Sequence, residues 1–322
     1  MNLLVTGGAG FIGSNFLILL TLGKLEISPS RVTVIDKLTY ASDINQIQPL
    51  IDEGLISFIQ GDICDPNLVN SLVGEHDYVV NFAAESHVDN SIKDSSSFVR
   101  SNVLGVDNIL TAIIRNPKTK LLQVSTDEVY GSIDSGSWNE ECAPNPNSPY
   151  AATKAAADLL VIAANRTHNI QTSITRCSNN YGPRQNSEKL IPKLIQQALN
   201  SENLTLYGDG TNVREWIHVN DHCKAIAWAI KNAEGGEIYN IGSHVELTNS
   251  QIAKAILDLI PESKSKVEFV KDRPGHDFRY SLDDTKIREM GFKNEENFVE
   301  GLARTIEWYR FNLEFAKKDH SG

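Results

Sequence analysis

Three glycines, Gly7, Gly10 and Gly13, follow the spacing G-x-x-G-x-x-G between a short apolar run at residues 3–6 and a helical pattern at residues 11–22. Without side chains, the backbone of such a turn can bend sharply and approach a pyrophosphate, whose negative charge is stabilised at a helix N-terminus. A strand, a glycine turn and a helix in this order predict the first βα unit of a parallel sheet that binds a dinucleotide.

Two acidic residues end the next two predicted strands. Asp36 lies roughly 20 residues beyond the last glycine, which is the offset expected of the acid that binds the cofactor ribose. A carboxylate there repels a 2′-phosphate, so we expect NAD rather than NADP, a preference that Lys37 beside it softens slightly. Asp62 is placed to reach the adenine.

Short apolar runs alternate with helical patterns through the first half of the chain, which is typical of a parallel sheet wound with helices. Beyond about residue 180 the elements become shorter and mixed. We therefore expect an α/β protein: a doubly wound, Rossmann-type NAD-binding domain over residues 1–180, to which some later segments return, and a smaller mixed α/β substrate domain over residues 181–322. The predicted strands are 3–6, 31–36, 56–60, 78–83, 121–125 and 171–176, and the predicted helices are 11–22, 43–51, 66–73, 96–115, 150–166 and 298–315.

Acidic residues outnumber basic ones by 41 to 30 in the 322 residues, which gives a net charge of −11 and argues against nucleic-acid and membrane partners. The four cysteines are far apart and form no Cys-x-x-Cys pair, so we expect a reducing compartment, no disulfide framework and no metal site. The first residues lack a basic segment and a cleavage site, and the longest apolar stretch, 16–22, is too short to span a bilayer. These features predict a cytoplasmic protein.

Five polar residues are candidates for chemistry. Tyr150 and Lys154 are one turn apart on a predicted helix, and a nearby positive charge is what allows a tyrosine to accept a proton from an alcohol at neutral pH. Thr126, Asp127 and Glu128 follow the fifth strand at its carboxyl end, where this architecture places its active site. We predict that these five residues face the cofactor crevice.

Two predicted helices, 96–115 and 150–166, are apolar over more than one face. Such a helix is either enclosed within one subunit or contacts a second copy of the chain, and the pattern itself does not distinguish the two.

Several motifs together resemble the extended short-chain dehydrogenase/reductases. They are the glycine turn, the segments 81–89, 125–131 and 176–183, and Tyr150-x-x-x-Lys154, with further matches at 188–192, 214–216 and 272–277. Within this family the resemblance is closest to the dTDP-glucose 4,6-dehydratases, because epimerases need no additional acid and base, and decarboxylases and GDP-mannose dehydratases usually carry Ser-Glu where this chain has Asp127-Glu128. A UDP-hexose 4,6-dehydratase, a 4-epimerase, a decarboxylase and an NAD-binding sensor remain alternatives.

The resemblance implies a reaction without net oxidation. Tyr150 would take the O4 proton while hydride passes from C4 of the sugar to NAD, with Thr126 near O4. Glu128 would then remove the C5 proton as Asp127 protonates the departing C6 hydroxyl, and hydride would finally return to C6 with a proton going to C5. The products would be dTDP-4-keto-6-deoxyglucose and water.

The resemblance also implies contact residues and a homodimer formed through the two apolar helices. Asn90 and Phe278 stand where the family commonly has arginine, which removes positive charge from the substrate side. The implied cofactor contacts are Gly7, Gly10, Phe11, Ile12, Gly13, Asp36, Lys37, Leu38, Thr39, Asp62, Ile63, Phe82, Ala83, Ala84, Ser86, Ser101, Tyr150, Lys154 and Asn180. The implied nucleotide-sugar contacts are Ser86, Thr126, Asn179, Glu188, Lys189, Arg214, Asn249, Arg273 and His276.

Overall fold

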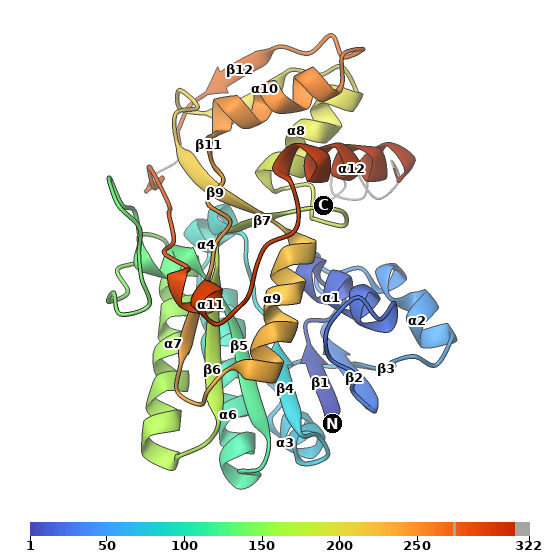
Figure 1. The fold of residues 1–322 in the computed structure, drawn as a ribbon, viewed down its shortest axis with the longest axis vertical. Coiled ribbons are helices and arrows are strands. Elements are labelled where there is room, and N and C mark those ends of the chain that lie inside the picture. The colour runs from blue at the N-terminus through green and yellow to red at the C-terminus, as the bar shows by residue number, and fades with distance from the viewer. Residues whose placement is uncertain (273–274, 313–322) are drawn as a thin grey trace.

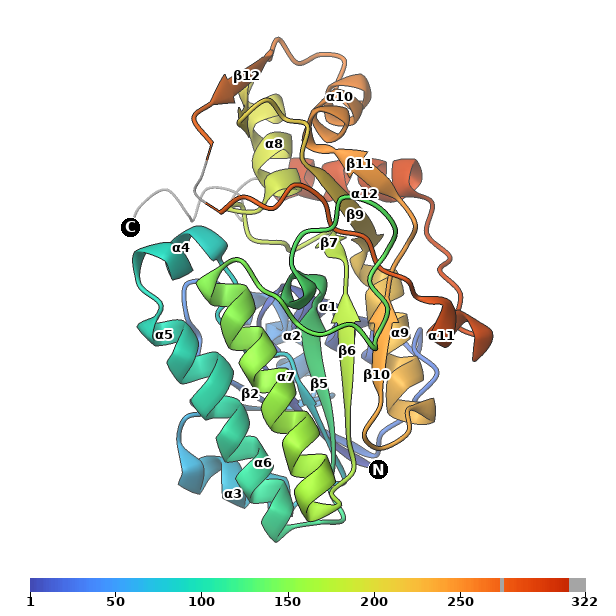
Figure 2. The same ribbon diagram turned by 90° about the vertical axis from the view of Figure 1, so that its left-hand side faces the viewer.

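Seven strands form a central sheet in the order β10-β6-β5-β4-β1-β2-β3, and every neighbouring pair in it is parallel (Figures 1 and 2). The computed structural model describes residues 1–272 and 275–312. The strand order reverses direction between β1 and β4, and ligands of such sheets bind at the carboxyl ends beside that point. The predicted doubly wound parallel sheet is confirmed. Its strands are β1 (Asn2–Thr6), β2 (Arg31–Asp36), β3 (Ser57–Gln60), β4 (Tyr78–Asn81), β5 (Lys120–Thr126), β6 (Thr172–Cys177) and β10 (Ile238–Ile241).

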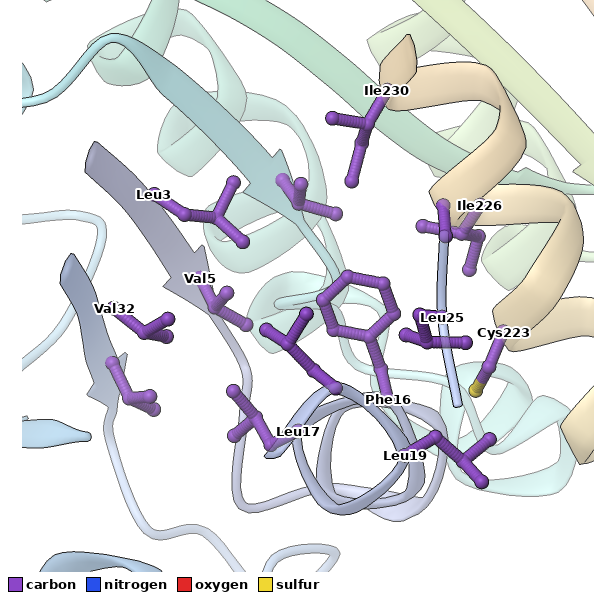
Figure 3. Close-up of a cluster of buried hydrophobic side chains, with 14 of the residues drawn as sticks. Leu3, Val5, Phe16, Leu17, Leu19, Leu25, Val32, Cys223, Ile226 and Ile230 are labelled. Atoms are coloured by element: carbon purple, nitrogen blue, oxygen red, sulfur yellow. The ribbon is translucent and has the colours of Figure 1, made fainter. Parts of the chain in front are cut away.

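Helices cover both faces of this sheet. One face is covered by α1 (Phe11–Thr21) and α9 (Val219–Asn232), and the other by α3 (Pro66–Gly74), α6 (Gly105–Arg115) and α7 (Pro149–His168). Figure 3 shows Phe16 of α1 among apolar side chains from β1 and from α9. The burial of these side chains from segments more than 200 residues apart holds α9 against the first βα unit.

The second lobe lies above the carboxyl ends of the sheet (Figure 1). Its core is formed by side chains of strands and helices that surround Trp216 and Tyr309. A three-stranded sheet has the order β11-β9-β7, and β12 pairs with β8. The elements are β7 (Asn179–Tyr181), α8 (Leu190–Leu199), β8 (Leu204–Tyr207), β9 (Val213–His218), β11 (Glu246–Thr248), α10 (Asn249–Leu259), β12 (Val267–Val270) and α12 (Phe298–Phe311).

The helix α7 begins where its sequence favours a start. Ser148 caps it by accepting a hydrogen bond from the amide of Ala151 at 3.1 Å, and Pro149 occupies the first turn, where its missing N–H is not needed. The helix ends at His168, and Asn169, the C-cap residue that follows, adopts a left-handed conformation. These signals place Tyr150 in the first turn, next to the carboxyl ends of the strands.

Some predicted elements differ in detail. The segment predicted as one helix at 43–51 is a 3₁₀ turn (Ile44–Gln46) followed by the short helix α2 (Gln48–Asp52), and β4 ends at Asn81 rather than at residue 83. The predicted helix 96–115 is continuous, but its middle part, Val99–Leu104, is a π-helix between α5 (Ser96–Phe98) and α6. The end of the predicted helix 298–315 lies outside the described residues. Sequence analysis predicted no range for α4 (Val88–Lys93) and α11 (Thr285–Glu289), nor for α8, α9 and α10, which it covered only as short mixed elements.

The two apolar helical segments lie side by side on one face of the sheet (Figure 2). Part of their apolar surface is buried against the strands, including Ile109 and Val161. Other apolar side chains point outward: Val99, Leu104 and Leu159 are 50%, 45% and 54% exposed. The sheet therefore accounts for only part of the apolar surface that the sequence places on these helices.

Candidate active site

A continuous cleft follows the carboxyl ends of the strands and passes into the second lobe. Asp36 and Asp62 lie at one end, Thr126 and Tyr150 line the middle, and Arg214 lines the far end. Its sections share lining residues, and the middle section alone has an empty volume of about 1110 Å³, including its open mouth. A cleft of this extent can hold two elongated polar ligands end to end.

The glycine turn forms one wall of the cleft. A Cβ atom on Gly7, whose φ is +70°, would lie 2.6 Å from the backbone nitrogen of Ala83 in the segment after β4. A Cβ atom on Gly13 would lie 2.4 Å from the carbonyl oxygen of Gly7. Both contacts are too close for any side chain, so glycine is required for the turn to pack here. At the N-terminus of α1 the cleft is therefore lined by backbone atoms with no side chains in front of them, an arrangement that suits a pyrophosphate.

Asp36 is fixed at the end of β2 by backbone donors. Its Oδ2 accepts a hydrogen bond from the amide of Ala9 at 2.9 Å, and its Oδ1 accepts one from the amide of Leu38 at 2.8 Å. Lys37 does not pair with Asp36 but with Asp62, at 2.9 Å between Nζ and Oδ2. The carboxylate of Asp62 thus balances the charge of Lys37, and Asp36 presents its own negative charge at this end of the cleft.

The structure places the expected cofactor residues on the wall of the cleft with one exception. Leu38 does not line it: its backbone is left-handed, with a φ of 59°, and its side chain packs against the apolar core beneath. The residues that do line it are Gly7, Gly10, Phe11, Ile12, Gly13, Asp36, Lys37, Thr39, Asp62, Ile63, Phe82, Ala83, Ala84, Ser86, Ser101, Tyr150, Lys154 and Asn180.

Thr126, Asp127 and Glu128 lie together where β5 passes into a 3₁₀ turn (Asp127–Tyr130). The hydroxyl of Thr126 donates to Oδ1 of Asp127 at 3.2 Å and accepts from the amide of Glu128 at 3.3 Å. Burial raises the pKa of Asp127 well above its usual value, and the negative charges of Glu128 and Glu215 raise it further. Asp127 is therefore suited to hold a proton and donate it.

Tyr150 and Lys154 both line the middle of the cleft and both are buried. Burial, followed by Glu128, Cys177 and Asp127, raises the pKa of Tyr150 well above its usual value, while a hydrogen bond with Thr126 acts in the opposite direction. Burial also lowers the pKa of Lys154, whose Nζ donates to the carbonyl of Val124 at 2.7 Å. Burial therefore opposes the phenolate form of Tyr150, and Lys154 is not among the main groups that shift its pKa, in contrast to the sequence argument.

Arg214 connects two backbone segments at the far end of the cleft. Its guanidinium donates to the carbonyls of Val213, Phe278 and Asp277 at 2.7, 3.1 and 2.8 Å, and it lies 4.4 Å from the centre of the Tyr280 ring. A guanidinium has five N–H donors, and in the described part of the chain three of them are taken by these carbonyls. Two donors and the full positive charge remain available to an anionic ligand.

Other predicted substrate residues join the two lobes. Nζ of Lys189 donates to the carbonyl of Ser86 at 2.7 Å across the cleft. Arg273 lies outside the described residues, and the remaining predicted substrate residues, Ser86, Thr126, Asn179, Glu188, Lys189, Arg214, Asn249 and His276, line the cleft. Sequence analysis missed Lys193, Tyr207 and Trp216, which also line it. In the sequence, the Gly-Asp-Gly turn that follows Tyr207 could have indicated that residue, and the position of Trp216 two residues after Arg214 could have indicated Trp216.

The two positions that depart from the family pattern are not among the residues that line the three sections of the cleft. Asn90 donates to the hydroxyl of Tyr40 at 3.2 Å, and the side chain of Phe278 is half exposed. All four cysteines are free thiols. Within residues 1–272 and 275–312, no group of three acidic, histidine or cysteine side chains is arranged to hold a metal ion, and no helix is long and apolar enough to cross a bilayer.

Comparisons with known proteins agree with this geometry. The family model described as GDP-mannose 4,6 dehydratase matches residues 4–305. A dTDP-glucose 4,6-dehydratase of Streptomyces niveus is 49% identical over 97% of this chain and 94% of its own length. The crystal structure of DesIV, a dTDP-glucose 4,6-dehydratase of Streptomyces venezuelae with NAD and dTDP bound, has a TM-score of 0.94 and 48% identity over 98% of each chain. A UDP-glucose 4-epimerase of Thermus thermophilus in complex with NAD has a TM-score of 0.87 and 29% identity over 96% of this chain and 99% of its own.

The raised pKa of Asp127 predicts a pH-dependent stability difference. Burial disfavours the ionised form of Asp127 in the folded protein. The free energy of unfolding should therefore fall as pH rises from the unfolded pKa, about 4, to the raised folded pKa. Relative to Asp127→Asn, the wild type should lose about 1.4 kcal/mol per pH unit within that window. Urea unfolding at a series of pH values measures this, with exposed Asp134→Asn as the control. A constant difference across pH would contradict burial of an ionisable Asp127.

Proposed function

The chain belongs to the GDP-mannose 4,6-dehydratase family of extended short-chain dehydrogenase/reductases, and on that premise we propose that it is a dTDP-glucose 4,6-dehydratase, an NAD-dependent hydro-lyase. It would convert dTDP-glucose to dTDP-4-keto-6-deoxyglucose and water. The observation that carries this proposal is the adjacent pair Asp127 and Glu128, which lies at the carboxyl end of β5 in one cleft with the glycine turn and Tyr150. Elimination of water needs an acid and a base together, whereas epimerisation at C4 needs no acid or base beyond the tyrosine.

The first lobe has the features that NAD requires. The bare backbone at Gly7 and Gly13 suits the pyrophosphate, and the carboxylate of Asp36 suits a ribose with a free 2′-hydroxyl. When bound, NAD supplies the acceptor for the C4 hydride and the donor that returns it to C6. We propose that residues 1–180, with α9 and β10, form the NAD-binding domain, and that the remainder mainly forms the nucleotide-sugar domain.

Three side chains, Tyr150, Glu128 and Asp127, carry the proton transfers, and Thr126 and Lys154 assist Tyr150. Tyr150, in a hydrogen bond with Thr126, takes the proton of the sugar 4-hydroxyl once it has ionised; burial opposes that ionisation, and the positive charges of Lys154 on the same helix and of bound NAD would favour it. Glu128 takes the C5 proton, which is acidic once C4 is a ketone, and returns a proton to C5 when hydride reaches C6. Asp127 keeps its proton because it is buried, so it can donate that proton to the departing C6 hydroxyl.

The second lobe supplies the charge that a nucleoside diphosphate needs. On a protein with a net charge of −11, binding of the diphosphate depends on local basic groups. The two available N–H donors of Arg214 fit a phosphate, and Lys189 lies nearby on the wall of the cleft. The thymine base is favoured by the relatives at 45–49% identity whose names specify dTDP-glucose.

The first experiment is incubation of the purified protein with dTDP-glucose, and separately with UDP-glucose, without added NAD. Mass spectrometry should show loss of one water from dTDP-glucose, because the cofactor is regenerated in each turnover and stays bound. Loss of water only from UDP-glucose would change the substrate and keep the reaction. No loss from either after NAD is supplied would contradict the proposal in favour of a 4-epimerase or a decarboxylase.

The acid–base assignment predicts a specific defect in Glu128→Gln. Without the C5 base, turnover should fall by roughly 100-fold or more, while oxidation at C4 continues. Absorbance of reduced cofactor should then accumulate, and exchange of the C5 hydrogen with deuterated water should be lost. Exposed Glu141→Gln is the control and should behave as the wild type. Full turnover in Glu128→Gln would show that another group removes the C5 proton.

We propose a cytoplasmic homodimer formed through the outward face of the π-helical segment Val99–Leu104, α6 and α7. The support is the exposure of Leu104 and Leu159 on neighbouring segments that contact each other, since exposed apolar side chains gathered on one face mark an interaction surface. The free cysteines fit a reducing compartment.

The combined change Leu104→Asp and Leu159→Asp should convert the dimer to a monomer, because both charges would be buried at the subunit contact. Light scattering coupled to gel filtration measures the mass directly. Leu22→Asp is the matched control, since Leu22 is 61% exposed at the end of α1, on the opposite face of the sheet. A doubly substituted protein that remains dimeric would place the interface elsewhere.

A further inference from the structure

A fully buried histidine lies behind the wall of the cleft. His222 is in α9, which covers the face of the sheet next to α1 (Figure 1). Its Nδ1 lies 2.9 Å from Oδ1 of Asn180, and Asn180 lines the cleft. In the described part of the chain its Nε2 has no hydrogen-bond partner. The one polar contact of this ring is therefore to a residue of the site.

The contacts of Asn180 determine which nitrogen of His222 carries the proton. The amide nitrogen of Asn180 donates to the carbonyl of Ser178 at 3.0 Å and to Sγ of Cys177 at 3.4 Å. The amide oxygen must then face His222 as an acceptor, so Nδ1 of His222 is the donor. Burial lowers the pKa of His222 to about 3, so the ring is neutral at physiological pH and only one of its nitrogens is protonated.

The hydrogen bonds continue from Asn180 to the start of the catalytic segment. Sγ of Cys177 donates to the carbonyl of Ser125 at 3.4 Å, and Ser125 directly precedes Thr126. His222, Asn180, Cys177 and Ser125 thus form one chain of donors and acceptors that runs from α9 across β7, β6 and β5. The last three residues line the middle of the cleft, beside Tyr150.

We propose that His222 is a positioning residue that sets the orientation of the Asn180 amide, and through it the floor of the cleft on which the nicotinamide end of the cofactor rests. This inference rests on the proposed function, because it assumes that NAD occupies the middle of the cleft. A reaction that removes hydride from C4 and returns it to C6 requires a cofactor that stays in place between the two transfers, and a rigid floor meets that requirement.

The energetics favour this role over packing alone. A buried nitrogen without a partner costs about 1–3 kcal/mol, whereas one hydrogen bond between neutral groups contributes roughly 0.5–1.5 kcal/mol. A leucine of similar size would match the other buried apolar residues of α9, such as Val219, Cys223 and Ile226, and would bury no unpaired nitrogen. The fold by itself therefore gains little from histidine at this position, and the benefit lies with the oriented Asn180.

Three substitutions of His222 separate orientation from packing. Asparagine keeps an N–H donor near the position of Nδ1, glutamine moves the donor toward Nε2, and leucine removes it. The affinity of the NAD-free protein for NAD, measured by calorimetry without sugar present, should fall roughly three- to tenfold in His222→Gln and His222→Leu. It should stay within about twofold of the wild type in His222→Asn.

A double-mutant cycle tests whether His222 acts through Asn180. Asn180→Ala should weaken NAD binding, and adding His222→Leu to it should produce little further loss, because coupled residues are not additive. The matched control is His76→Gln, which alters a buried histidine bonded to Leu72 and Thr33 away from the cleft. It should lower the melting temperature and leave NAD affinity unchanged.

Two outcomes would overturn the inference. Wild-type NAD affinity in His222→Leu would show that the ring does not influence the cofactor. Equal losses in His222→Asn, His222→Gln and His222→Leu, additive with Asn180→Ala, would show a packing role only. Because binding is measured without substrate, a wild type that binds NAD but dehydrates neither nucleotide sugar would contradict the proposed function while leaving this inference intact.

Discussion

The parallel pairing of β5 with β4 on one side and β6 on the other is the constraint on which the rest of the site depends. In this register Thr126 lies opposite Cys177, at the level where both strands end. The catalytic segment, the thiol that contacts it and the turn into β7 are therefore brought to the same edge of the sheet. A shift of one residue would turn Thr126 away from the cleft, because side chains alternate between the two faces of a strand.

Burial then determines the charge of each group at that edge. Removal from water favours the neutral form, so the pKa of Asp127 rises and that of Lys154 falls. Asp158, one turn further along α7, raises the pKa of Lys154 and so opposes the effect of burial. Arg176 pairs with Asp158 at 2.9 Å. A buried ion pair beneath the site thus supports the charge of Lys154, and removal of either partner would leave an unpaired buried charge.

The second lobe contributes binding groups through contacts that also join it to the first. Lys189 reaches the carbonyl of Ser86 across the cleft, and Arg214 uses three donors on backbone carbonyls and keeps two for a ligand. Because these carbonyls already hold the guanidinium, it loses little further conformational freedom when a ligand binds. Ordering it therefore costs less of the binding energy. The cleft between the lobes is therefore organised before any substrate enters.

The sequence by itself determined the features that depend on near neighbours: the strand and helix pattern, the glycine turn, the acid after β2, and the helical spacing of Tyr150 and Lys154. Only the tertiary structure decided that β10 joins the sheet, that Lys37 pairs with Asp62, that Lys154 donates to Val124, and that His222 lies behind Asn180. These contacts join residues that are mostly far apart in the chain, and no local period or spacing encodes which of many polar groups will meet. Burial, which sets the pKa of Asp127 and Tyr150, likewise exists only once the lobes and helices have packed.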